Sequence, residues 1–226
     1  MQKESSIYLQ IEDLLNYKRS YMMQGLDQVF GTPAIGSIII PDFALPLRNN
    51  CQNGQWTLGD EPAGNKGFFS ILNFSKFFGD LGHTTKTLWG QIWLVAENGS
   101  SEDIPDNVVM VTYIKTRSLG SFNQLIVKLQ SKGINPATGV FCPKYIKHSK
   151  GLPDGSTANY YSLEWHWRER TDKDKPIQKL SDCLLHADSF VDPTGTANMQ
   201  CLDGLGASQI QAIISGQNTH ILADRN

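Results

Sequence analysis

The stretch that decides the fold is TLWGQIWLVAE (residues 87–97), followed by VVMVTYIKTR (108–117) and SLGSFNQLIVKLQSKG (118–133). In the first two segments, side chains of different character alternate with a period of two, which is typical of β-strands. The third segment has an apolar stripe at helical spacing, and Gly133 is a glycine of the kind that ends a helix. That stripe consists of Leu119, Phe122, Leu125, Ile126 and Leu129. The stretch therefore predicts two strands and then a helix.

The neighbouring segments extend this pattern in both directions. An apolar run at 67–74 predicts a preceding strand, and 139–148 and 159–170 predict two further strands. Pro153, Asp154 and Gly155 lie between these last two strands and are typical turn residues. The order is that of an OB-fold, a five-stranded barrel with one helix between its third and fourth strands, although other α+β domains share it. We therefore expect an α+β, mainly β chain with an OB-like barrel at 67–170.

The regions on either side of this barrel are less regular. In residues 1–66, apolar positions at 5–24 predict an N-terminal helix, and an edge strand at 38–40 lies within sequence rich in Gly, Pro and Asn. We expect this region to pack on the core. Residues 171–226 are expected to form a C-terminal accessory segment with a short helix near 208–214.

The composition excludes several classes of protein. With 40% hydrophobic and 19% charged residues, the chain is neither a coiled coil nor fully disordered. No apolar run approaches the roughly 20 residues that span a bilayer, and the N-terminus lacks the pattern of a secretory signal. We therefore expect a cytoplasmic protein that does not associate with membranes. The four cysteines are too widely spaced for a zinc motif, so we predict reduced thiols, no metal and no cofactor.

Charge is distributed unevenly along a chain whose net charge is only -2. Residues 107–153 contain seven Lys or Arg and no Asp or Glu, whereas 181–226 contain five Asp and one Arg. A basic segment of this kind indicates a polyanionic partner, but a basic face docked on an acidic protein, or on the chain's own acidic C-terminal region, has the same pattern.

Aromatic and basic residues share faces of the predicted strands. Binding of single strands needs this combination, because bases stack on aromatic rings while Lys and Arg neutralise phosphates. The sequence thus predicts a non-catalytic protein that binds single-stranded nucleic acid, with DNA and RNA both open. The predicted contact residues are Tyr113, Lys115 and Arg117 on the third strand and Lys144, Tyr145, Lys147 and Lys150 on or near the fourth, with Tyr145 exposed. Trp89 and Trp93 are candidates for stacking, although core positions are slightly favoured for both.

Two alternative functions come from other classes. The first is a structural or interaction subunit whose basic strip docks on an acidic protein partner, with a homo-oligomer left open. The second is a hydrolase or nuclease, because Glu164, His166 and Arg168 share one face of the fifth predicted strand. A carboxylate can orient a histidine that acts as general base, and an arginine can hold an anion. An ordinary polar strand face has the same pattern, so these three residues are weak catalytic candidates.

Overall fold

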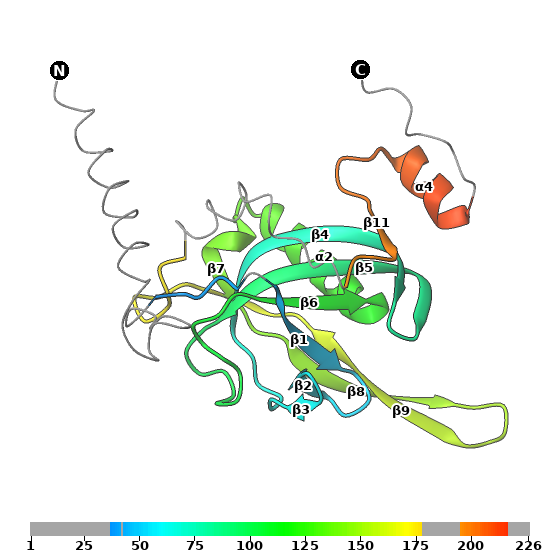
Figure 1. Cartoon of the computed structure of the whole chain (residues 1–226), viewed down its shortest axis with the longest axis horizontal. Coiled ribbons are helices and arrows are strands. Elements are labelled where there is room, and N and C mark those ends of the chain that lie inside the picture. The colour runs from blue at the N-terminus through cyan, green and yellow to red at the C-terminus, as the bar shows by residue number, and fades with distance from the viewer. Residues whose placement is uncertain (1–36, 42, 178–194, 217–226) are drawn as a thin grey trace, which may run out of the picture. The chain divides into compact units, whose positions relative to one another are not determined.

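A computed structural model of the chain describes residues 37–41, 43–177 and 195–216, and the chain divides into two compact units, Met1–Ile39 and Ile40–Asn226. The fold described below is that of the second unit. Its centre is an antiparallel meander of three strands, β4 (Phe69–Leu81), β5 (Thr84–Ala96) and β6 (Met110–Lys115) (Figure 1). The predicted helix at 5–24 lies outside the described residues.

Further strands extend the meander at both edges into one large mixed sheet. On one side, β1 (Leu45–Asn50) pairs with β6 in parallel, and β2 (Gln55–Leu58) and β3 (Glu61–Pro62) follow in antiparallel order. On the other side, β7 (Gly139–Phe141) pairs with β4 and β10 (Trp167–Glu169) pairs with β7. A short strand from the C-terminal region, β11 (Met199–Cys201), pairs with the distal part of β4.

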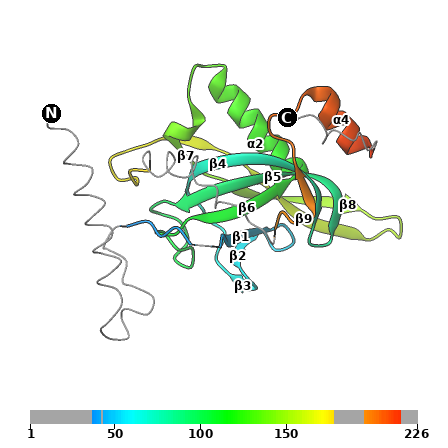
Figure 2. The same ribbon diagram turned by 45° about the horizontal axis from the view of Figure 1, so that its top comes forward.

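Helix α2 (Thr116–Gln130) covers one face of this sheet, as the two views show (Figures 1 and 2). Its apolar stripe is partly as predicted: Leu119, Phe122 and Leu129 are buried, and the first two belong to the main core cluster. Phe122 packs against Phe141 and Trp165 at ring-centroid distances of 5.7 and 5.1 Å. After the helix, the 3-10 turn η2 (Pro136–Thr138) leads into β7.

Two further strands, β8 (Lys144–Gly151) and β9 (Thr157–Glu164), form a long antiparallel hairpin of their own (Figure 1). Hydrogen bonds outside the ladders attach β9 to the rest of the unit. The Tyr161 N–H donates to the Cys51 carbonyl at 2.7 Å, and the Leu163 N–H donates to Ser118 Oγ at 3.0 Å. The base of the hairpin is thus held between the residue that follows β1 and the start of α2.

The predicted class and the order of elements in 67–170 are found: the unit is mainly β, with α2 between the third strand of the meander and the strands that follow. The strand bounds differ. The predicted fourth strand is broken at Cys142 and Pro143 into β7 and β8, and the fifth is broken at Trp165 and His166 into β9 and β10. Among the described residues, the pairings form an open path from β10 to β3 with the β8–β9 hairpin beside it, so a closed barrel is not found.

The segments beyond the predicted barrel contain more structure than the sequence indicated. Residues 45–62, expected to be irregular, form β1 to β3. In the C-terminal region the short helix predicted near 208–214 is present as α4 (Ala207–Ser215), while β11 was not predicted. Neither α2 nor α4 is long and apolar enough to cross a membrane.

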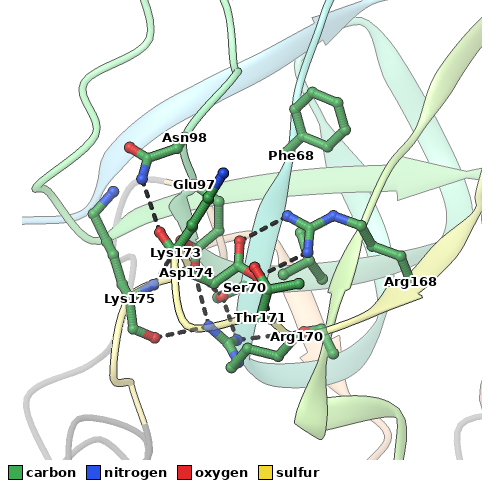
Figure 3. A network of polar contacts seen from close by, with 12 residues as sticks. Phe68, Ser70, Glu97, Asn98, Arg168, Arg170, Thr171, Lys173, Asp174 and Lys175 are labelled. Atoms are coloured by element: carbon green, nitrogen blue, oxygen red, sulfur yellow. Dashed lines mark hydrogen bonds and ion pairs between the residues drawn. The ribbon is translucent and has the colours of Figure 1, made fainter.

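A buried ion pair fixes the segment that follows β10 to the sheet (Figure 3). The carboxylate of Glu97, the residue that follows β5, has no exposed side-chain surface and pairs with Arg170 at 3.0 Å. Arg170 also donates to Ser70 Oγ at 2.6 Å and to the Lys175 carbonyl at 2.7 Å. The backbone N–H of Lys175 donates to the second Glu97 oxygen at 2.9 Å. These contacts satisfy a buried charge that would otherwise be costly.

Candidate functional site

A groove of about 760 Å³ opens along the face of the sheet that points away from the main core. Alternation along the strands explains which side chains reach it. Leu47 on β1, Ile114 on β6 and Leu163 on β9 belong to the core cluster, although Leu47 also borders the groove. Their neighbours point the other way, because successive side chains in a strand lie on opposite faces. These outward-facing neighbours line the groove: Arg48 on β1, Tyr113 and Lys115 on β6, and Ser162 on β9.

The groove is positively charged. Its lining contains Arg48, Lys115 and Arg117, and no Asp or Glu is among the described residues that line it. Arg48 and Asp60 approach to 3.8 Å, but both side chains are largely exposed, so this pair contributes little and leaves Arg48 able to bind an anion. Lys115 is held more firmly, because its ammonium donates to Thr84 Oγ1 and lies 4.9 Å from the centre of the Trp89 ring.

The aromatic residues of the groove differ in how freely they can meet a ligand. Tyr113 is half-buried, and its hydroxyl accepts a hydrogen bond from Gln91 Nε2 at 2.8 Å. Trp89 lines the groove but is only 6% exposed, partly beneath Lys115, and Trp93 is 3% exposed with its indole N–H donated to Gln91 at 3.2 Å. Trp93 does not line the groove. Both tryptophans are thus buried, although neither belongs to the main core cluster.

Arg117 reaches the groove from a different element than predicted. The sequence placed it on the third strand with Tyr113 and Lys115, but β6 ends at Lys115 and Arg117 lies in the first turn of α2. The chain changes direction at Thr116, which has a positive φ of 46°. Ser118 lies within the first turns of α2, and its hydroxyl accepts from the Leu163 N–H.

Tyr145 contradicts the prediction of an exposed stacking residue. Its ring packs at the base of the β8–β9 hairpin, with centroids 5.6 Å from Trp56 and 6.5 Å from Tyr161. Its hydroxyl is buried without a hydrogen-bond partner among the described residues, and this burial raises the pKa of Tyr145 strongly. The sequence missed this because Trp56, its main neighbour, comes from a segment that was expected to be irregular.

The three predicted lysines near Tyr145 are exposed on β8 but do not line the groove. The register separates them. Lys147 lies opposite Tyr161, whereas Lys144 and Lys150 lie on the other face, opposite Glu164 and Ala158. The seven predicted contact residues therefore do not form a single surface: Tyr113, Lys115 and Arg117 come together, and the rest lie along the hairpin.

The weak catalytic candidates are not brought together as a set. Glu164 Oε2 and His166 Nε2 are 4.0 Å apart on an exposed surface, with side chains 55% and 44% exposed. Arg168 is instead bound to Asp174 through two hydrogen bonds of 2.7 Å (Figure 3). This pairing holds the pKa of Asp174 well below its usual value. Because its guanidinium is bound to Asp174, Arg168 does not act as an anion clamp beside His166.

The described part of the chain contains three free cysteines, one of which lines the groove. Cys51 lines the groove, but burial raises the pKa of its thiol, which disfavours the nucleophilic thiolate. No group of three or more His, Cys, Asp or Glu within these described residues is arranged to hold a metal ion.

Several groove residues were not among the predicted contacts, and Arg48 and Tyr160 are two of them. Arg48 lies on β1, which the Gly- and Pro-rich surroundings obscured, although Asn53-Gly54 between β1 and β2 is a strong hairpin signal. Tyr160 lies on β9 at the edge of the groove, on the strand face that the sequence associated with Glu164 and His166. Comparisons with family models, with curated proteins and with solved structures found no match for this chain.

Proposed function

We propose that this protein binds single-stranded nucleic acid, without catalysis, in the groove lined by Arg48, Lys115 and Arg117. The observation that carries the proposal is that three cations from three different elements meet in one groove whose described lining contains no acid. Cations placed in this way attract the phosphates of a nucleic acid and release its condensed counterions, which is the main source of sequence-independent affinity.

The aromatic residues favour a single strand over a duplex as the ligand. Tyr113 and Tyr160 lie along the same groove as the cations. Unpaired bases stack on such rings for about 1 to 3 kcal/mol each, whereas the bases of a duplex are already stacked on one another. The combination supports binding through phosphates and base faces, with little dependence on sequence.

An OB-like arrangement is the finer fold assignment that accompanies this proposal. Three observations support it: the order of the meander, helix α2 and the following strands, the antiparallel pairing of β7 with β4, and the hairpin formed by β8 and β9. In this arrangement β1 occupies the place between β6 and β9, since it pairs with β6 and is followed by Cys51, which accepts from Tyr161. OB-folds bind oligonucleotides on a comparable outer face.

The proposal is tested by removing groove cations and following the binding of a fluorescent oligothymidylate by anisotropy at several salt concentrations. The variant Arg48→Ala/Arg117→Ala removes two exposed charges. It should weaken binding and flatten the log–log salt slope by up to about 1.4, from about 0.7 per phosphate contact on a single strand. Lys128→Ala is the matched control, because Lys128 is exposed near the other end of α2 and does not line the groove.

Equal binding by the parent, the double variant and the control would contradict the proposal. If the parent shows no affinity for nucleic acid at low salt while light scattering shows a defined oligomer, the interaction subunit becomes the better account. Turnover of a phosphodiester that His166→Ala abolishes would instead support the hydrolase or nuclease.

A further inference from the structure

The β8–β9 hairpin has two faces with different surroundings. Its ladder pairs His148 with Tyr160 and Lys147 with Tyr161, so these two pairs lie on opposite faces. Tyr161 shares its face with Leu163 of the core, and a Cβ built on Gly54 would lie 2.7 Å from its ring. The face of Lys147 is thus the inner face, which continues from the core.

The outer face of the hairpin is continuous with the groove. Tyr160 and Ser162 belong to this face and line the groove; Tyr161 of the inner face lines it too, but its ring packs against Gly54. His148 joins them from β8: its Nε2 lies 2.8 Å from Ser162 Oγ, and its ring stacks on Tyr160 with centroids 5.1 Å apart and an interplanar angle of 30°. The outer face therefore presents a stacked aromatic pair directly at the edge of the groove.

Further along the outer face, exposed positive charge favours the binding of a polyanion. Lys150 lies two residues beyond His148, on the same face, and is exposed; Ile146, two residues before His148, is 37% exposed. At the base of the hairpin, Lys144 lies opposite Glu164, so the positive charge there is offset by a carboxylate. The net positive charge of the outer face is thus concentrated toward Lys150.

We propose that a single strand leaves the groove along the outer face of the hairpin, so that the preferred ligands are extended single strands rather than mononucleotides or very short oligonucleotides. The inference rests on the proposed function. In this path the His148–Tyr160 pair stacks with a base, and Lys150 contacts a phosphate beyond it. The eight residues of β8 extend about 26 Å at roughly 3.3 Å per residue, which is long enough to add several nucleotides to the binding site.

Two lysines on the same strand provide a matched test, because Lys147 and Lys150 are both exposed but lie on opposite faces. Lys147→Ala and Lys150→Ala are compared in the full chain, with oligothymidylates of about 4 and about 16 nucleotides, the limits of site size for such folds. We expect Lys150→Ala to weaken binding of the longer strand and reduce its salt slope by about 0.7, with the shorter strand unaffected. Lys147→Ala should match the parent with both.

Three results would overturn the inference: equal effects of the two substitutions, no effect of Lys150→Ala on the longer strand, or an equal loss with both lengths. The groove variant Arg48→Ala/Arg117→Ala is measured alongside. If it lowers affinity for both lengths while Lys150→Ala changes nothing, the path along the hairpin is wrong and the proposed function stands. If neither variant changes binding, the proposed function also fails.

Discussion

At the scale of single residues, Glu97 shows how a buried charge is stabilised. Its carboxylate receives hydrogen bonds from Arg170, Ser70 and the Lys175 backbone. Breaking a buried ion pair by removing one partner costs about 3 to 5 kcal/mol, because the remaining charge stays buried. Since Ser70 and Lys175 would still donate after loss of the arginine, a value at the lower end of this range is expected.

We therefore predict that Arg170→Ala lowers the free energy of unfolding by about 3 kcal/mol, measured by denaturation with urea. Lys173→Ala is the control, because this neighbouring lysine is exposed and its interaction with Asn98 uses the backbone carbonyl. The control should change stability by less than about 0.5 kcal/mol. Equal stability of the two variants would show that the ion pair does not stabilise the fold.

Whether a residue's surroundings could be predicted depended on where its neighbours came from. Alternation within β6 was sufficient to place Tyr113 and Lys115 on one face, because that strand is regular over its length. Alternation also paired Tyr145 with Lys147, but it could not show that Trp56 would cover Tyr145 and leave Lys147 exposed. Arg48 was missed because its importance arises only from the approach of β1 to β6.

At the scale of elements, two serine hydroxyls of α2 accept hydrogen bonds from backbone N–H groups at the end of β9 and just after it, as the carbonyls of a neighbouring strand would. Ser118 Oγ accepts from the Leu163 N–H at 3.0 Å, and Ser121 Oγ accepts from the Trp165 N–H at 2.9 Å. Leu163 and Trp165 are both buried, so their backbone donors have few other partners available. The helix therefore holds the base of the hairpin by hydrogen bonds as well as by apolar packing.

Ser118→Ala should accordingly destabilise the fold by about 1 to 3 kcal/mol, although alanine is the better helix former, because a buried N–H loses its acceptor. Thermal unfolding followed by circular dichroism would measure the change. Gln124→Ala, at an exposed position of the same helix, should be close to neutral. A Ser118→Ala protein as stable as the Gln124→Ala protein would mean that the hydrogen bond contributes nothing.

The elements that could be predicted were those in which the pattern of apolar and polar residues repeats regularly over many residues, such as the meander and α2. The first strands were harder to predict, because proline is unusual within a sheet. Pro46 is tolerated because this part of β1 pairs only with β6, and the ladder with β2 begins at the next residue. The break between β9 and β10 also follows from tertiary structure, since the donor at Trp165 bonds to the helix.

At the scale of the whole molecule, folding divides the basic segment 107–153 among three places. Lys115 and Arg117 enter the groove, Lys128 and Lys132 lie near and just beyond the end of α2, and the lysines of β8 lie along the hairpin. The sequence therefore predicted a basic protein surface but not which of its cations lie together in the fold. The third cation of the groove, Arg48, comes from outside the basic segment and lies on β1.

The salt dependence of binding to single-stranded and duplex oligonucleotides of equal length tests the central claim most directly. With three groove cations and Lys150 in contact with phosphates, the log–log slope for the single strand should be roughly -2 to -3, at about 0.7 per contact. The single strand should also bind more tightly than the duplex at every salt concentration, because only its bases can stack on Tyr113 and Tyr160. Binding that is independent of salt, undetectable at low salt, or tighter for the duplex would contradict the account.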